Sequence, residues 1–253
     1  MPYSKNPYLT CTAIAVILVY NNNSHNSAAS QTKGHMIMDM REVIVSAGKK
    51  LIREGFTVDT WGNISVRDDS GLVYITPSGM DYETCTADDV VVMTIDKEIV
   101  SGTRRPSIET DLHLSVYRAR PEVKALVHTH PICSTVFSCM GEGIPLIIDE
   151  AAQALGDEVK TAAYALPGTM ELANNCVEAL GKKANACLLQ SHGAVCLGQD
   201  IKGAFKVAKV LEMTAEIYFR IRSVGGNYIP LLESDIAAMQ EFVAKKYGQP
   251  NNI

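Results

Sequence analysis

The sequence lacks a block of basic residues, a paired-cysteine motif and an apolar run long enough to cross a bilayer. Its net charge is −5 at pH 7. This argues against a nucleic-acid partner, because such binding needs clustered positive charge to neutralise phosphates. The seven cysteines are odd in number and form no C-x-x-C pair. That pattern indicates reduced thiols in a cytoplasmic protein rather than a disulfide framework.

The apolar stretch at residues 9–20 is too short to span a membrane, which takes roughly 20 residues. We therefore expect no membrane partner. Residues 1–35 contain this stretch and a polar segment after it, and we interpret them as an N-terminal extension. A signal peptide is the alternative, which the unpaired cysteines disfavour. No Pro/Gly/Ser-rich linker divides residues 36–253, which predicts one domain there.

The order of apolar patterns predicts helices mixed with short strands. Helical spacing predicts helices at residues 39–55, 106–121, 131–143, 169–183, 200–226 and 234–248. Short apolar runs between turn residues predict strands at 63–67, 72–76, 90–95, 123–130 and 144–149, and two strands within 185–198. The order does not follow a strict βαβ alternation. It therefore predicts a three-layer α/β/α single domain whose central sheet is mixed and largely antiparallel.

Two histidines lie one residue apart in the segment "VHTH". Side chains at i and i+2 of a strand point to the same side, so His128 and His130 can bind one divalent metal ion together. A catalytic zinc site takes three protein ligands and leaves one position open. His192, which follows another apolar run and precedes Gly193, is the candidate for the third ligand. The alternative for each histidine is a polar residue at a loop. For His113, one helical turn after Glu109, we expect a structural role, and support of the site is the alternative.

Glu109 lies near the start of the predicted helix 106–121, where a carboxylate can simply stabilise the first turn. A catalytic role is the alternative for this residue. The pairs Gly62-Asn63 and Ser78-Gly79 offer N–H, amide and hydroxyl groups that suit a phosphate. Ser107 adds a hydroxyl near a helix start. Each feature is weak alone, because such residues also occur in ordinary turns.

In their order, the segments "GNISVR", "ITPSGMDYE", "PSIE", "ALVHTH", "LLQSHG" and "KKYG" resemble the class II aldolase/adducin family. The resemblance covers nearly all of residues 38–250. It implies an α/β/α domain that assembles as a homotetramer with active sites at subunit interfaces. By matching position it also implies the following site: one Zn2+ per chain held by His128, His130 and His192; an acid/base residue, Glu109; phosphate-binding residues Gly62, Asn63, Ser78, Gly79 and Ser107; and a C-terminal catalytic tyrosine, Tyr247.

Two positions depart from the pattern of the family's aldolases. Ile108 stands where they carry a second serine, and Asp149 stands where they carry a tyrosine after "IPxIx". An ionised aspartate cannot donate a proton at neutral pH. Tyr247 is therefore the better candidate for the proton on the aldehyde side, and the aldehyde itself stays open.

The resemblance implies a zinc-dependent aldolase that reversibly cleaves a ketose 1-phosphate, such as L-fuculose 1-phosphate, to dihydroxyacetone phosphate and an aldehyde. The metal would stabilise the enediolate as a Lewis acid, and Glu109 would move a proton. A ribulose-phosphate 4-epimerase and a methylthioribulose-1-phosphate dehydratase are alternatives on the same scaffold. The family's epimerases carry Asp at the position of Glu109, which favours the aldolase. A non-catalytic adducin-like interaction domain is disfavoured, because that class lacks the zinc histidines.

Overall fold

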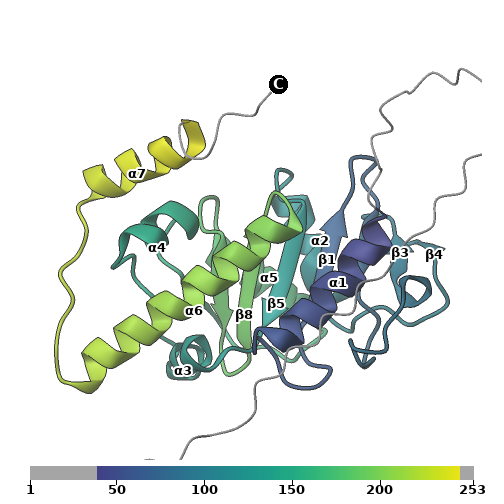
Figure 1. Ribbon diagram of the computed structural model, residues 1–253, viewed down its shortest axis with the longest axis horizontal. Coiled ribbons are helices and arrows are strands. Elements are labelled where there is room, and N and C mark those ends of the chain that lie inside the picture. The colour runs from purple at the N-terminus through teal and green to yellow at the C-terminus, as the bar shows by residue number, and fades with distance from the viewer. Residues whose placement is uncertain (1–38, 246–253) are drawn as a thin grey trace, which may run out of the picture. The chain divides into compact units, whose positions relative to one another are not determined.

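A computed structural model describes residues 39–245, which form one eight-stranded sheet covered by helices (Figure 1). The strands are β1 (Asn63–Arg67), β2 (Val73–Ile75), β3 (Val91–Met93), β4 (Ile99–Ser101), β5 (Ala125–Thr129), β6 (Thr161–Ala162), β7 (Ala186–Leu189) and β8 (Gly193–Gly198). Their spatial order is β4-β3-β2-β1-β5-β8-β7-β6. All neighbours are antiparallel except β6 and β7, which are parallel. The predicted mixed, largely antiparallel sheet is confirmed.

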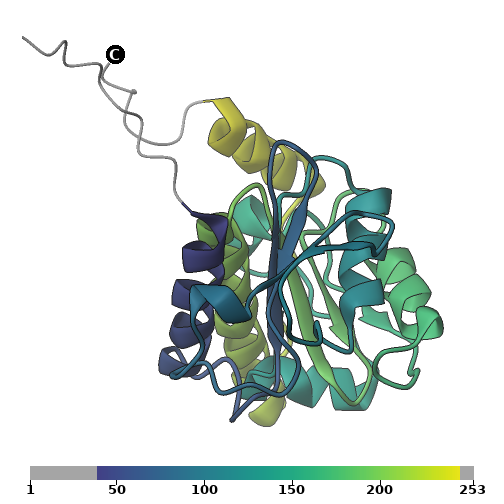
Figure 2. The ribbon, with the colours of Figure 1, turned by 90° about the vertical axis from the view of Figure 1, so that its right-hand side faces the viewer.

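Helices cover both faces of this sheet, as its edge-on view in Figure 2 shows. They are α1 (Met40–Arg53), α2 (Thr110–Ala119), α3 (Ile132–Met140), α4 (Asp149–Ala154), α5 (Met170–Leu180), α6 (Ile201–Ser223) and α7 (Glu233–Lys245), with one 3-10 turn, η1 (Ala87–Asp89). One core lies between the sheet and α1 and α6, and a second core lies between the sheet and α2 and α5. The three-layer α/β/α prediction is therefore confirmed.

The two strands at the centre of the sheet carry polar residues on the face that α2 covers. On β5, Val127 packs into the α1/α6 core and Leu126 packs into the α2/α5 core. Side chains alternate along a strand, so His128 lies on the same face as Leu126. Asn63 of β1 is the register partner of His128. The alternation of side chains along β5 and the pairing of β1 with β5 thus place Asn63 and His128 together on the face that α2 covers.

Two expected elements are wrong in their bounds or type. The helix predicted from Pro106 begins only at Thr110. Pro106 forms an isolated β-bridge with Pro77, and the Ser107 N–H donates a hydrogen bond to Thr76 O, so these residues follow the neighbouring segment 76–77 instead of a helix. The strand predicted at 144–149 is irregular apart from a single bridge at Ile144. Its apolar side chains still pack against the α1/α6 core. The short apolar run correctly indicates that this segment is buried. Burial alone, however, does not distinguish a strand from an irregular segment.

Sequence patterns missed β4, β6 and α4, which are two to six residues long and too short to show a period. The last helix, α7, packs on α4, and its Gln240 side chain donates to the backbone oxygens of Ala152 and Gly156. Across residues 39–245, no helix has the length and apolar character needed to cross a membrane.

Candidate metal centre and active site

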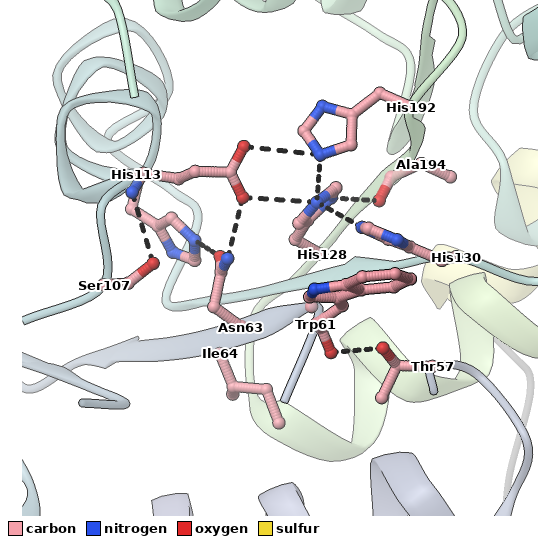
Figure 3. A network of polar contacts seen from close by, with 12 residues as sticks. Thr57, Trp61, Asn63, Ile64, Ser107, His113, His128, His130, His192 and Ala194 are labelled. Atoms are coloured by element: carbon pink, nitrogen blue, oxygen red, sulfur yellow. Dashed lines mark hydrogen bonds and ion pairs between the residues drawn. The ribbon is translucent and has the colours of Figure 1, made fainter. Parts of the chain in front are cut away.

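Three histidines from two neighbouring strands converge at one end of the sheet (Figure 3). His128 is near the end of β5, and His130 follows that strand directly. His192 lies in the turn between β7 and β8, and the pairing of β5 with β8 brings this turn beside the end of β5. The Nε2 atom of His128 is 2.8 Å from that of His130 and 3.3 Å from that of His192. The predicted triad therefore comes together in space.

The donor set of this triad fits a divalent metal ion. His128 Nδ1 lies 3.0 Å from the carbonyl oxygen of Ala194, which can only accept, so Nδ1 carries a proton and Nε2 is the nitrogen that can ligate a metal. Burial lowers the pKa of His130 to about 3 and that of His192 to about 4, so both rings are neutral at pH 7. Neutral imidazole nitrogens facing one another are a ligand set for zinc, although nitrogen ligands alone do not select it over other divalent metals.

The carboxylate of Glu109 faces this triad instead of capping its helix. Glu109 occupies the N-cap position of α2 without a side-chain capping bond, and it is only 4% exposed. Its Oε2 lies 3.2 Å from His128 Nε2, and its Oε1 lies 3.6 Å from His192 Nε2. Oε1 has no hydrogen-bond partner, which is unusual for a buried carboxylate. An additional cation or substrate group at this position would satisfy it.

The environment of Glu109 favours its ionised form. Burial by itself raises its pKa, but His128, His192 and the hydrogen bond from Asn63 lower it, and the net direction is downward. Asp111, instead of Glu109, is the acidic residue in the first turn of α2. That carboxylate makes a 2.7 Å ion pair with Lys97. The structural alternative for Glu109 is therefore not supported by its contacts.

A cavity of about 520 Å³ opens in front of Glu109 and the triad. Its walls contain every residue predicted for phosphate binding, together with Glu109 and two of the histidines. The lining residues are Thr60, Trp61, Gly62, Asn63, Pro77, Ser78, Gly79, Ser107, Ile108, Glu109, His130, Pro167, Ser191 and His192. His128 is almost fully buried behind this surface. The structure thus brings together the three predicted metal ligands, Glu109 and the predicted phosphate-binding residues.

The predicted phosphate-binding residues, here called the polar cradle, do not all offer free backbone N–H groups as expected. The cradle consists of Gly62, Asn63, Ser78, Gly79 and Ser107. The Ser78 N–H donates to Arg105 O, and the Ser107 N–H donates to Thr76 O. These two residues therefore offer their hydroxyls to a ligand. The Ser107 hydroxyl oxygen also accepts a 3.2 Å bond from the Glu109 N–H, which fixes its position beside the carboxylate.

Two apolar residues of the cavity were not expected to contribute to the site. Trp61 and Ile108 are each 64% exposed and both line the cavity. The Trp61 ring stacks on His130 with a centroid separation of 6.5 Å. In the sequence, the signal for Trp61 was its position directly before the "GN" pair of the predicted phosphate loop.

Of the two residues considered for the aldehyde-side proton, Asp149 lies within the described structure and does not line this cavity. It is exposed at the first position of α4. Tyr247 lies outside the described residues. Neither residue is therefore tested as a proton donor by this geometry.

A glycine holds the loop that carries Asn63 against the triad. Gly62 has φ +79°, and a Cβ there would lie 2.8 Å from His128 O. We expect Gly62→Ala to lower the free energy of unfolding by more than the roughly 1–2 kcal/mol of a left-handed alanine alone, because the new methyl group also meets backbone. Gly71→Ala is the matched control, since Gly71 has φ +90° with no atom within 4 Å. Urea unfolding of both variants measures the difference, and equal losses would contradict the steric argument.

Several known proteins are similar to this chain in sequence and in fold. The family model described as "Class II Aldolase and Adducin N-terminal domain" matches residues 42–219. A 5-deoxy-D-ribulose 1-phosphate aldolase from Bacillus thuringiensis is 39% identical over 85% of this chain and 99% of its own length. A 5-methylthioribulose-1-phosphate/5-deoxyribulose-1-phosphate aldolase from Rhodospirillum rubrum is 35% identical over 83% of this chain and 92% of its own length.

A solved structure agrees with these relatives. An L-fuculose 1-phosphate aldolase superposes with a TM-score of 0.77 at 35% identity, over 81% of this chain and 95% of that chain. These proteins are, by name, lyases that act on sugar phosphates, and the prediction of a class II aldolase enzyme is confirmed at this level. With the matched region spanning most of the sheet, the triad and Glu109, the chain belongs to the class II aldolase and adducin family.

Proposed function

We propose that this protein is a metal-dependent aldolase that cleaves a ketose 1-phosphate to dihydroxyacetone phosphate and an aldehyde. One observation carries the proposal: an ionised, buried carboxylate and three converging histidines form one wall of a cavity that also holds a polar cradle. A carboxylate beside a metal site can move a proton next to a carbonyl, and the cradle suits a phosphate. The same arrangement is not needed in a domain that only binds a partner.

The reaction is written most simply in the cleavage direction. The C3–C4 bond of the ketose breaks, and its electron pair stays on the phosphorylated half as an enediolate. The C4 hydroxyl loses its proton and becomes the aldehyde carbonyl. The enediolate then takes a proton at C3 and becomes dihydroxyacetone phosphate. A bound divalent metal would supply Lewis-acid stabilisation of the negative charge.

The chain's own residues have distinct roles in this proposal. In the condensation direction the ionised carboxylate of Glu109 removes the proton from C3; in cleavage Glu109 first takes up a proton from solvent, which balances the one that the C4 hydroxyl loses, and delivers it at C3. The hydroxyls of Ser78 and Ser107, with Gly62, Asn63 and Gly79, hold the phosphate and so fix the three-carbon half before the bond breaks. Tyr247 remains the proposed donor to the aldehyde oxygen in the condensation direction.

The proposed cofactor is one Zn2+ per chain, held by His128, His130 and His192, because three nitrogen ligands with an open position suit catalytic zinc. We also propose a cytoplasmic homotetramer in which a neighbouring subunit completes each site. Exposed apolar side chains around the cavity, such as Trp61 and Ile108, are consistent with a surface that another subunit covers.

The proposed aldehyde half is a short, deoxygenated one. Relatives at 39% and 35% identity are named for 5-deoxyribulose and 5-methylthioribulose 1-phosphates. Trp61, Ile108 and Pro167 give the cavity an apolar part that suits a methyl or methylthio end better than a hydroxyl. We therefore expect 5-deoxyribulose 1-phosphate to be cleaved with a higher kcat/KM than L-fuculose 1-phosphate.

The test is a product assay on the zinc-loaded protein with three ketose 1-phosphates: 5-deoxyribulose, 5-methylthioribulose and L-fuculose. We expect dihydroxyacetone phosphate and the matching aldehyde in equal amounts. Each methylene buried in an apolar pocket is worth about 1 kcal/mol or more, so the preference for the best substrate should be roughly tenfold or larger.

Other products would decide between the alternatives. An epimerised pentulose phosphate would identify an epimerase, and a dehydrated phosphate would identify a dehydratase. Either result without dihydroxyacetone phosphate would overturn the proposal. A relative at 32% identity is named as an L-ribulose-5-phosphate 4-epimerase, so a ribulose 5-phosphate control belongs in the same panel.

A further inference from the structure

A chain of buried hydrogen bonds runs from Glu109 into the α2/α5 core, away from the cavity. Asn63 Nδ2 lies 2.8 Å from Glu109 Oε2, and Asn63 Oδ1 lies 2.5 Å from His113 Nε2. Beyond the imidazole, His113 Nδ1 lies 2.6 Å from Ser65 Oγ, and Ser65 Oγ lies 2.7 Å from Tyr117 Oη. Figure 3 shows Asn63 and His113 of this chain of hydrogen bonds. The members beyond Asn63 lie outside the cavity wall.

The direction of each bond follows from the orientation of the Asn63 amide. Its nitrogen can only donate and lies against Glu109, and its oxygen can only accept and lies against His113. His113 Nε2 must then carry the proton, and Nδ1 must accept from the Ser65 hydroxyl. The Ser65 oxygen in turn accepts from the Tyr117 hydroxyl. Each donor thus points toward Glu109, and such chains strengthen their members.

His113 is suited to orienting the Asn63 amide, and it does not line the cavity where a substrate would react. Its side chain is 0% exposed, and burial lowers its pKa to about 3, so it stays neutral. It touches neither the cavity nor the triad. A neutral histidine with both ring nitrogens bonded has one defined tautomer, and this tautomer allows only one orientation of the Asn63 amide.

We infer that His113 is a positioning residue that acts through Asn63 to hold the carboxylate of Glu109 in its reactive place. This inference rests on the proposed role of Glu109 as the proton-transfer group. Without the donor at His113, the Asn63 amide is free to flip. Its oxygen would then face a carboxylate oxygen to which it cannot donate, and the carboxylate would shift relative to the triad.

The test compares two substitutions at one buried position. His113→Leu removes the donor to Asn63, and His113→Gln keeps an N–H near the place of Nε2. Loss of groups that orient an active-site residue typically costs 10–100-fold, so we expect kcat of His113→Leu to fall by about that factor. KM should change far less, because the cradle is intact. His113→Gln should recover most of kcat, and Tyr117→Phe, at the far end, should have a smaller effect than His113→Leu.

Leu114→Ala is the matched control for damage to the core. Leu114 is equally buried in α2 but belongs to no hydrogen bond of the chain. It should lower the melting temperature without lowering kcat at temperatures well below unfolding. If His113→Leu keeps the wild-type kcat, or if His113→Gln is as impaired as His113→Leu, the positioning role is wrong.

A second measurement does not depend on turnover. Nitrogen-15 spectra of histidine-labelled wild-type protein report which ring nitrogen carries the proton. We expect His113 protonated at Nε2 and bare at Nδ1, and a bare Nε2 would overturn the inference. If the wild-type protein cleaves no ketose 1-phosphate but shows the expected tautomer, the proposed function fails and the role of His113 in it fails with it. Cleavage by the wild type with an unimpaired His113→Leu overturns the positioning role alone.

Discussion

Replacement of Glu109 by glutamine is expected to lower the rate of aldol cleavage by about 10²–10⁴-fold and to leave the fold intact. The side chains have the same size, and Asn63 can still bond the amide oxygen of glutamine. What is lost is the group that exchanges a proton at C3. Steady-state cleavage of the best ketose 1-phosphate measures the effect, with circular dichroism as the check on the fold.

A second readout locates the loss in one step. Dihydroxyacetone phosphate alone should exchange its C–H proton with solvent deuterium on the zinc-loaded wild-type protein, and this exchange needs the base but no aldehyde. Exchange on Glu109→Gln should fall by a factor similar to that of cleavage. If cleavage falls while exchange persists, another residue removes the proton.

The matched control is Asp111→Asn, two residues along the same helix start. Asp111 is bonded to Lys97 and does not line the cavity. Partly exposed ion pairs contribute little, about 0–1 kcal/mol, so this variant should keep its activity with at most a small loss of stability. Equal losses of activity in both variants would indicate that the helix start, rather than the Glu109 carboxylate, is what the reaction needs.

The sequence predicted the fold wherever a period was long enough to read. The 23-residue helix α6 and the apolar strands β7 and β8 were clear, because many residues repeat the same pattern. The errors lie in segments 106–109 and 144–149, where tertiary bonds decide the conformation. Pro106, for example, suits a first helical turn but is tied to Pro77 across the sheet edge.

The metal ligands of the site could be predicted from the sequence, but the hydrogen bonds that hold Glu109 in place could not. Spacing alone placed His128 and His130 on one side of a strand, and geometry confirms their proximity. The partnership of Asn63 with Glu109 depends instead on the register of β1 against β5 and on where α2 begins. No local pattern contains that information, so the buried chain through His113 could be found only from the structure.

Removal of the metal ligands is expected to give the largest loss. The double variant His128→Ala/His130→Ala should hold far less than one zinc per chain, because a single remaining histidine cannot retain the ion against dilution or chelators. Lewis-acid stabilisation is worth several kcal/mol, which corresponds to a loss of cleavage of about 10³-fold or more. Elemental analysis of protein purified without chelator, together with the cleavage assay, measures both quantities. Wild-type protein stripped by a chelator should lose activity to the same extent and regain it when zinc is restored, whereas the double variant should not respond to added zinc.

The matched control removes two other histidines, His25 and His35, which lie outside the described residues. His25→Ala/His35→Ala should keep its zinc and its activity. Manganese or cobalt in place of zinc should restore part of the activity, because the three nitrogen ligands bind several divalent ions. Stoichiometric zinc in the triad variant would place the metal elsewhere, and full activity of a metal-free wild type would remove the metal from the reaction. Either result would leave the convergence of three histidines beside the Glu109 carboxylate without its proposed purpose.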